Sequence, residues 1–378
     1  MSLNSGARPT EIHALNGARA IPPLVLVLFH FCEQRGYFGV PAIDLFVGKG
    51  YLWVEFFFAL SGFILIHVYG ARFKMSGYAT FLKTRAARLY PLHLATLLLL
   101  LALVWFTRAI APLTGHTSIF DQPYHPIVSG ITFVANLFLV QAWNLFPYLS
   151  WNAPAWFVSV ELLLCILFPA YAFVARGNRR RGILLIGAGI AGWVALAATS
   201  GNDGLDITFH NGIFRGMAGF AVGAGMALVY RGLKRIDTHL VNVLQAGALA
   251  GLIFAIYFGG PRHTGNDVLV AAWMAALIFV LALDRGIVAR IFQTRVLTRL
   301  GEWSYAIYLV QFPLIQGLRT LRQYYPPEFR TLGDYSGAVQ WIEAGALLAA
   351  AIGLGALLTV AIERPIHARL RRLITAKG

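Results

Sequence analysis

Long apolar runs dominate this sequence and leave it few folds to adopt. Eleven such runs follow one another along the chain, roughly at 20–34, 51–69, 91–108, 127–143, 155–175, 183–199, 214–230, 241–258, 268–283, 303–317 and 338–362. A helix that crosses a bilayer needs about 20 mostly apolar residues. Stretches of Leu, Ala, Val and Ile favour helices over barrel strands, whose polarity alternates over about ten residues. The sequence therefore predicts an all-α polytopic membrane protein.

The composition excludes the main soluble classes. Of the 378 residues, 58% are hydrophobic and only 12% are charged, whereas about 25% are charged in a soluble domain. Such a chain is neither a soluble multidomain enzyme nor a disordered protein. Its net charge of +15 would suggest nucleic acid for a soluble chain, but here we expect membrane lipid and no nucleic acid. Cys32 and Cys165 lie in apolar runs and are predicted to be buried thiols.

Basic residues are concentrated between alternate runs. Most of the 31 Lys and Arg residues fall into six clusters, at 8–19, 72–88, 176–181, 231–235, 285–299 and 364–377. Cytoplasmic loops of membrane proteins carry an excess of Lys and Arg. We therefore expect all six clusters in the cytoplasm, together with both termini: a short N-terminal segment, 1–18, and a basic tail, 363–378.

Two segments, 109–126 and 144–154, contain neither Lys nor Arg and are expected outside. The run between them, 127–143, then cannot cross and is interpreted as a re-entrant or interfacial element. About ten transmembrane helices remain, within one integral-membrane domain over 1–378. The alternative is eleven crossings with an external C-terminus, which would place the basic tail on the wrong side.

Ionisable residues inside a membrane span are costly and point to function. Arg19 and His30 are eleven residues apart, which is close to three turns of one helix and about 16.5 Å along its axis. His30 is thus predicted to lie deep in the first run, on the face of Arg19, with Glu33 one turn further on. A neutral imidazole there suits a general base, because its protonation changes near neutral pH. The alternative is a hydrogen-bonded histidine of the core.

The next polar candidates lie in the second run and in the loop after it. For Glu55 and Ser61, the alternatives to a functional role are an interfacial carboxylate and a small residue at a helix contact. Arg85 and Arg88 follow at positions i and i+3 and share a helical face. Two guanidinium groups can hold phosphate through paired hydrogen bonds, although plain positive-inside charge explains the spacing equally well.

An aromatic-rich segment leads into the fifth run, which carries Trp156, Ser159 and Glu161. Aromatic residues gather at membrane interfaces by default, and they also form platforms for sugar faces. Arg215 and Tyr305, in later runs, complete the set of polar residues expected to face inward. No spacing of His, Cys or acidic residues supports a metal site, and none is expected.

Seven short patterns, in order, resemble those of the membrane-bound acyltransferase family 3. They are Arg19 and His30 in LNGARAIPPLVLVLFH, VEFFFALSGFIL with Glu55, FLKTRAARLYP with Arg85 and Arg88, WFVSVELLL with Glu161, the helix from Arg215 to Gly223, LGEWSYAIYLVQFP, and IERP. Three positions depart from the family pattern: Glu55 replaces Asp, Phe157 replaces Ser, and Gln311 replaces His. The resemblance covers nearly the whole chain.

Members of this family O-acylate exopolysaccharides, lipopolysaccharide O-antigens, Nod factors and some macrolides. The resemblance implies an O-acyltransferase of the bacterial inner membrane, with cytoplasmic acyl-CoA as donor and acetyl as the first choice of acyl group. The implied acceptor is a sugar hydroxyl of an exopolysaccharide, a lipopolysaccharide or a lipid-linked glycan. No permanently bound cofactor is implied. Two other interpretations stay open: acylation of a small-molecule glycoside, and secondary transport of an anionic solute.

The implied roles follow the chemistry of each side chain. Arg19, Arg85 and Arg88 would bind acyl-CoA, and His30 would take the proton of the attacking hydroxyl. Glu33 or Glu161 would hold the tautomer of His30, whereas Gln311 is expected to be structural. The other candidates would stabilise the oxyanion or contact the acceptor: Glu55, Ser61, Trp156, Ser159, Arg215 and Tyr305. Direct transfer and a two-step path through an acylated residue both stay open.

Overall fold

A computed structural model describes residues 11–70, 73–115, 126–234, 236–260, 266–323 and 337–375. Over these ranges all regular structure is helical and no strand occurs, which confirms the predicted all-α class. The α-helices are α1 (His13–Ala18), α2 (Ile21–Arg35), α3 (Pro41–Gly48), α4 (Trp53–Leu65), α5 (Tyr78–Thr114), α6 (Gly130–Leu137), α7 (Trp156–Ile166), α8 (Phe168–Val174), α9 (Arg179–Thr199), α10 (Gly212–Arg231), α11 (Thr238–Phe258), α12 (Asp267–Leu281), α13 (Ile287–Phe292), α14 (Arg295–Arg322), α15 (Gly337–Leu358) and α16 (Arg364–Thr375). Two π-helices, η2 (Ile66–Gly70) and η8 (Thr359–Glu363), continue α4 and α15. Short 3₁₀ helices lie at Gly50–Leu52, Met75–Gly77, Pro126–Val128, Ala153–Ala155 and Gly201–Asp203.

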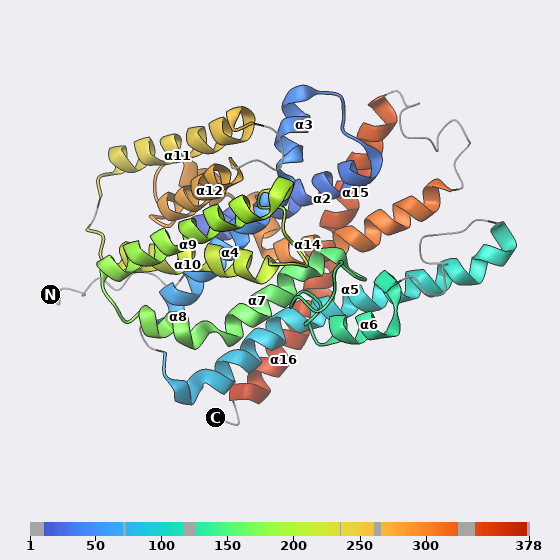
Figure 1. Cartoon of the computed structure of the whole chain (residues 1–378), viewed down its shortest axis with the longest axis horizontal. Helices are drawn as coiled ribbons and strands as arrows, with labels where there is room; N and C mark the ends of the chain where they lie inside the picture. Colours follow the sequence, from blue (N-terminus) through green and yellow to red (C-terminus); the bar gives the residue numbers. More distant parts are fainter. Residues whose placement is uncertain are drawn as a thin grey trace.

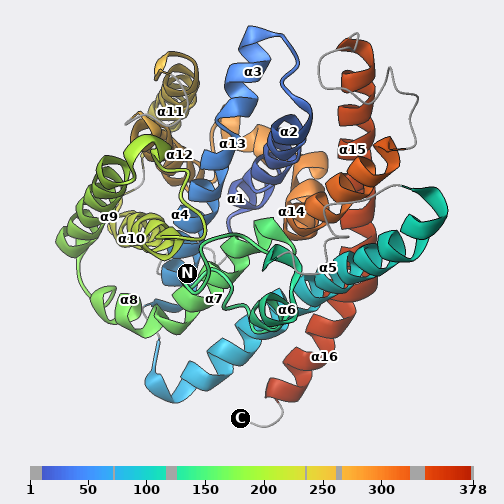
Figure 2. The same ribbon diagram turned by 45° about the vertical axis from the view of Figure 1, so that its right-hand side comes forward.

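The helices form a bundle with α4 in its interior (Figure 1). Helix α10 packs against α9 and α4, helix α11 packs against α12, and α14 contacts α1, α2, α5 and α15. Figure 2 shows α1 and α4 near the middle, with α9 to α12 on one side and α5, α15 and α16 on the other. Segments from both ends of the chain therefore meet around the central helices.

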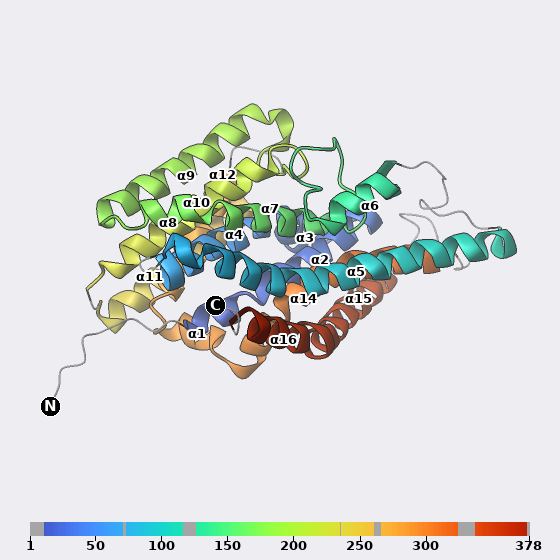
Figure 3. The same cartoon turned by 90° about the horizontal axis from the view of Figure 1, so that it is seen from below.

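Helix α5 is one long helix that crosses the whole molecule, and one of its ends projects beyond the rest (Figure 3). Its 37 residues correspond to about 55 Å at the rise of an α-helix. Large apolar side chains stand out from its second half: Trp105, Phe106 and Leu113 are 64%, 59% and 86% exposed. An apolar outer surface of this kind fits a lipid environment.

Glycine allows α4 and α10 to approach until their backbones touch. A Cβ added at Gly62 of α4 would lie 2.1 Å from the carbonyl oxygen of Phe220, and one at Gly223 of α10 would lie 1.9 Å from that of Ala59. Helices α9 and α10 meet in the same way, since a Cβ at Gly225 would lie 2.4 Å from a backbone oxygen of α9. Small residues at helix contacts are typical of membrane bundles. For Ser61, the sequence left close helix packing open as the alternative to a functional role. The structure shows such packing at the next residue, Gly62.

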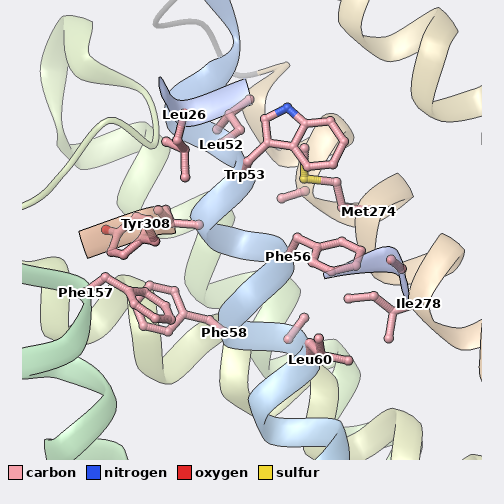
Figure 4. Close-up of a cluster of buried hydrophobic side chains, with 14 of the residues drawn as sticks. Leu26, Leu52, Trp53, Phe56, Phe58, Leu60, Phe157, Met274, Ile278 and Tyr308 are labelled. Atoms are coloured by element: carbon pink, nitrogen blue, oxygen red, sulfur yellow. The ribbon is translucent and has the colours of Figure 1, made fainter. Parts of the chain in front are cut away.

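Helix α4 also separates two groups of buried side chains (Figure 4). Phe157 of α7 and Tyr308 of α14 lie on one side of it, and Met274 and Ile278 of α12 lie on the other. The ring of Phe58 reaches toward the first group and lies 4.7 Å from the ring of Phe157. The two cysteines are buried, free thiols, as the sequence predicted.

Judged by helix length and apolar composition, fewer segments qualify as membrane spans than the ten that the sequence predicted. Within the described residues, seven helical segments are long and apolar enough to cross, and the pair α7 and α8, bent by 55°, makes an eighth if it is counted as one span. Helix α12 has only 15 residues, and α14 is long enough, with 28, but is more polar. The structure thus supports a multi-pass membrane protein, while the count of ten and the sidedness of the termini stay predictions.

The run 127–143 contains one α-helix, the short helix α6, which follows the 3₁₀ helix Pro126–Val128. Eight residues rise about 12 Å, which is far less than the hydrocarbon thickness of about 30 Å. The side chain of Ser129, which precedes the helix, accepts a hydrogen bond from the amide of Thr132. After the helix the chain turns back at Leu139, whose φ is 56°. This geometry agrees with the interpretation of the run as an element that does not cross.

The predicted sidedness can be tested with reporter fusions. A reporter after Arg181 should be cytoplasmic, because this cluster of arginines resists translocation, and so should one after the basic tail. One at Asn152 should be external; His116, the other external candidate, lies outside the described residues. Paired fusions to a phosphatase active only outside and a fluorescent protein active only inside give the measurement. An external C-terminus would rule out the ten-span arrangement.

Candidate active site

A cavity of about 250 Å³ lies where α1, α4, α5, α7 and α14 meet. Six of the predicted site residues line it: Arg19, Ser61, Arg85, Arg88, Glu161 and Tyr305. Its other walls are mainly apolar and include Phe57 and Leu60 of α4, Phe157 of α7 and Tyr308 of α14. The fold therefore brings polar residues from five separate helices into one largely apolar chamber.

Two local features position the arginines. Arg19 is the residue that follows α1, and Pro22 and Pro23 lie in the first turn of α2, which begins at Ile21. Proline is tolerated there because the first turn of a helix does not need its N–H groups. Arg19 therefore lies at a junction between two short helices, whereas the sequence spacing assumed a single one. Arg85 lies 5.5 Å from the ring of Tyr69, a distance at which a cation and an aromatic face attract.

A second, wider hollow of about 790 Å³ adjoins the cavity and shares Arg19 and Arg88 with it. Five arginines and three glutamates line this hollow: Arg19, Arg88, Arg295, Arg299, Arg364, Glu11, Glu302 and Glu363. Glu302 accepts hydrogen bonds from Arg299 and Arg364 at 3.1 and 2.8 Å. The excess of positive charge makes this basin, as we call the second hollow, suited to an anion with several phosphates.

Two polar groups in the cavity are buried without a partner. Within the described residues, neither Oε2 of Glu161 nor Oγ of Ser304 has a hydrogen-bond partner, and both residues line the cavity. Ser61 lies within hydrogen-bonding reach of the Glu161 carboxylate. The hydroxyl of Tyr305 donates to the carbonyl of Leu89 at 2.6 Å. Unpaired buried polar atoms are costly, so Glu161 and Ser304 favour a ligand with polar groups of its own.

His30 does not line the cavity but is linked to its wall through Gln311. It is half-buried on α2, and its Nδ1 atom lies 3.2 Å from Oε1 of Gln311 on α14. Gln311 in turn donates from Nε2 to the carbonyl of Tyr308 at 2.8 Å, and Tyr308 lines the cavity. Glu33 is exposed and accepts a hydrogen bond from Tyr37 at 3.4 Å. The structure thus pairs His30 with Gln311, which sequence reasoning had treated as structural.

Glu55 and Arg215 form a buried ion pair between α4 and α10. The other oxygen of Glu55 accepts from Nε1 of Trp193 at 2.9 Å. The remaining guanidinium nitrogens of Arg215 donate to the carbonyls of Ile207 and Tyr51 at 3.0 and 2.8 Å. Neither residue lines the cavity or the basin. The geometry gives the pair a role in helix packing, in place of the contact with acceptor or oxyanion that the sequence suggested.

Trp156 and Ser159 do not line the cavity either: Ser159 holds the loop before α7, and Trp156 packs against Arg215. The hydroxyl of Ser159 donates to the carbonyl of Leu139 at 2.7 Å and accepts from the amide of Ala142 at 3.3 Å. The guanidinium carbon of Arg215 lies 5.4 Å from the centre of the Trp156 ring. Both side chains therefore have structural partners that a sequence cannot reveal.

Sequence reasoning missed several residues that the fold adds to the site. Tyr308 lies three positions after Tyr305 and four after Ser304 on α14, spacings that bring residues together on a helix surface, so spacing could have indicated them. Glu363 reaches the basin from the π-helix η8, a type of turn that is frequent at functional sites. Within the described ranges, no group of three His, Cys, Asp or Glu residues is placed to hold a metal ion.

Comparison with known proteins identifies the family. The family model described as acyltransferase domain matches residues 12–362. The chain belongs to acyltransferase family 3. All seven sequence patterns start within the matched region, as do the residues of the cavity from Ile12 onward. No solved structure matches the chain.

Three curated relatives agree with this assignment. Acyltransferase MdmB of Streptomyces mycarofaciens is 29% identical over 97% of this chain and 94% of its own length. Protein 2 in picA locus of Rhizobium radiobacter is 33% identical over 43% of this chain and 93% of its own. Putative peptidoglycan O-acetyltransferase YrhL of Bacillus subtilis (strain 168) is 21% identical over 80% of this chain and 48% of its own. The family membership and these names make an acyltransferase the function class of the protein and leave the transporter interpretation without support.

Proposed function

We propose that this acyltransferase moves an acetyl group from acyl-CoA to a hydroxyl group of a saccharide. The observation that carries the proposal is the continuity of the site. A basin rich in arginine shares Arg19 and Arg88 with a narrow, mostly apolar cavity, and His30 lies 3.2 Å from Gln311, whose amide donates to the carbonyl of Tyr308 in the cavity wall. A ligand with a phosphate-rich head and a thin arm matches this shape.

CoA has this form, with phosphates on its nucleotide and a pantetheine arm that carries the thioester. Arg19, Arg85 and Arg88 would bind the phosphates, since guanidinium groups bind phosphate through paired, charge-assisted hydrogen bonds. The arm would enter the cavity, where the unpaired atoms of Glu161 and Ser304 offer partners for its amide groups. The predicted location of both arginine clusters on the cytoplasmic side agrees with the compartment of acyl-CoA.

In the proposed step, the imidazole of His30 takes the proton from the acceptor hydroxyl as its oxygen attacks the thioester carbonyl. The carbon–sulfur bond of the tetrahedral intermediate then breaks. The CoA sulfur leaves as a thiolate and receives the proton from His30, so that an ester and free CoA are the products. Ser61 and Tyr305, which line the cavity, are the predicted oxyanion donors that remain after Ser159 is assigned to the loop.

The name of YrhL supports a saccharide of the cell envelope as acceptor, because that relative is described as a putative peptidoglycan O-acetyltransferase. We extend the proposal to an exopolysaccharide, a lipopolysaccharide or a lipid-linked glycan at the inner membrane. Acylation of a small glycoside is the other outcome that the following experiment can give.

The test uses the purified full chain with acetyl-CoA labelled in its acetyl group. Transfer of label to an envelope saccharide fraction, with release of CoA thiol, would support the proposal. Transfer to a soluble glycoside alone would assign a small-molecule acceptor. If the protein takes up an anionic solute in vesicles and leaves the thioester intact, the proposed function is wrong.

The donor site gives a specific prediction for Arg88. Replacement of Arg88 by alanine should weaken acetyl-CoA binding by about 10–100-fold, because it removes charge-assisted hydrogen bonds to phosphate. Lysine at this position should restore only part of the affinity, since it lacks the planar fork. Calorimetric titration of the variants with acetyl-CoA gives the dissociation constants.

A matched control for Arg88 is Arg290→Ala, since Arg290 is an exposed arginine of α13 that lines neither hollow. This variant should bind acetyl-CoA as the wild type does. If an Arg85→Ala/Arg88→Ala double variant binds acetyl-CoA with unchanged affinity, the two arginines do not bind the donor and are explained by the positive-inside rule alone.

A further inference from the structure

We infer that Gln311 is a positioning residue that selects one tautomer of His30, and this inference rests on the proposed function. The two side chains come from opposite ends of the chain, and Oε1 of Gln311 lies 3.2 Å from Nδ1 of His30. Gln311 is completely buried on α14. Its amide therefore has few possible hydrogen-bond partners, and each of them constrains the orientation of the amide.

The orientation of the Gln311 amide follows from its second contact. The other end of the amide lies 2.8 Å from the carbonyl oxygen of Tyr308. A carbonyl oxygen can only accept a hydrogen bond, so the group that faces it must be the NH₂ of the amide. The amide oxygen is then left to face His30. A flip of the amide would set two oxygen atoms against each other and is excluded on energetic grounds.

The protonation of His30 follows from the orientation of the amide. An amide oxygen accepts hydrogen bonds and cannot donate them, so Nδ1 of His30 must carry its proton. In the neutral imidazole the other nitrogen, Nε2, then has a free lone pair. This is the tautomer that a general base needs when Nε2 faces the reacting hydroxyl, and the logic is that of an oriented base in a triad.

Pro313 and the segment before α7 fix the position of α14 beside His30. Pro313 lacks an N–H, so the carbonyl of Leu309 loses its helical partner. Nδ2 of Asn152 donates to this carbonyl at 3.0 Å, and the hydroxyl of Tyr308 donates to the carbonyl of Pro154 at 2.5 Å. Both contacts are made by the residues just before Gln311, and they tie this part of α14 to the segment before α7.

The charge of the group that faces Nδ1 affects the protonation of His30, just as its shape affects the orientation of the ring. Besides Gln311 on α14, the groups that act on His30 are the backbone of Leu26, one turn earlier on α2, which also hydrogen-bonds to it, and the carboxylates of Glu33 on α2 and Asp206 in the segment before α10. A neutral amide orients the imidazole and stabilises its protonated form less than a carboxylate in the same place would. The assignment gives the orienting role to Gln311, in place of Glu33 or Glu161.

Three variants of the full-length protein test this inference, with release of CoA thiol from acetyl-CoA as the readout in the presence of a saccharide fraction. Gln311→Met keeps the volume and removes the acceptor; kcat should fall about 10-fold, the equivalent of one hydrogen bond, with KM for acetyl-CoA unchanged. Gln311→Glu keeps an acceptor on Nδ1 and should retain most of kcat at high pH. Its acidic limb should move up by about one pH unit, because the carboxylate stabilises protonated imidazole.

Gln316→Met is the matched control, since Gln316 is a second buried glutamine of α14 that lines neither hollow. It should keep the wild-type kcat and pH profile. The inference is overturned if Gln311→Met keeps the wild-type kcat, or if Gln311→Glu loses activity to the same extent as Gln311→Met with an unmoved pH profile. If Gln311→Met does not fold, the pH profile of Gln311→Glu still decides. A fully active His30→Ala protein would instead refute the proposed function itself.

Discussion

Replacement of His30 by alanine should lower acyl transfer by about 10²–10⁴-fold, the usual contribution of a general base. Folding should change little, because alanine enters a membrane helix more easily than histidine does. Acetyl-CoA should still bind, since His30 lines neither of the two hollows that carry the arginines. Turnover and donor affinity, measured on the same purified protein, separate the two effects.

His93 provides the comparison for His30. It is completely buried, and its Nε2 atom lies 2.7 Å from the carbonyl of Asn136, which is the behaviour of a structural histidine. His93→Ala should lower the unfolding temperature and leave the turnover of the folded fraction close to that of the wild type. Acyl transfer at the wild-type rate by a well-folded His30→Ala protein would remove His30 from the chemistry.

The largest effect on stability should come from the pair of Glu55 and Arg215. Arg215→Met should destabilise the protein by about 3–5 kcal/mol, because it leaves the carboxylate of Glu55 buried without its counter-charge. The double variant Glu55→Gln/Arg215→Met should recover much of this loss, since no uncompensated charge remains. Thermal unfolding in detergent, followed by size-exclusion chromatography, measures both.

An exposed arginine serves as the control for this pair. Arg299 lies on the surface, 56% exposed, with its partner Glu302 44% exposed. Arg299→Met should change the free energy of unfolding by less than about 1 kcal/mol, as is typical of exposed ion pairs. A single Arg215→Met variant that is as stable as Arg299→Met would show that the buried pair does not hold α4 against α10.

The sequence predicted the parts of the structure that depend on local pattern. An apolar run is a short-range feature that can be recognised without knowing the fold. All ten runs that were expected to cross coincide with helices. The pair of Arg85 and Arg88 could be found because residues three positions apart share a helix face. The patterns of the family then indicated that Arg19, Glu161 and Tyr305, although distant in sequence, belong to the same site, and all three line one cavity.

Partners that are distant in sequence could not be predicted in this way. Glu55 pairs with Arg215 across 160 positions, and His30 meets Gln311 across 281. A polar residue in an apolar run looks the same whether it lines a cavity or satisfies a neighbouring helix. The sequence therefore placed Glu55 in the candidate site, where the fold uses it for packing, and placed Gln311 among structural residues, where the fold sets it beside the base.

The glycine contacts of α10 have a consequence for how a substrate enters. Helices α4, α9 and α10 meet backbone to backbone at Gly62, Gly223 and Gly225, with no flexible side chains between them that could change rotamer. Close-packed backbones do not slide without steric clashes, so the cavity wall formed by α4 is rigid. Any widening of the cavity during a catalytic cycle must then come from displacement of α1, α5, α7 or α14 against a stationary α4.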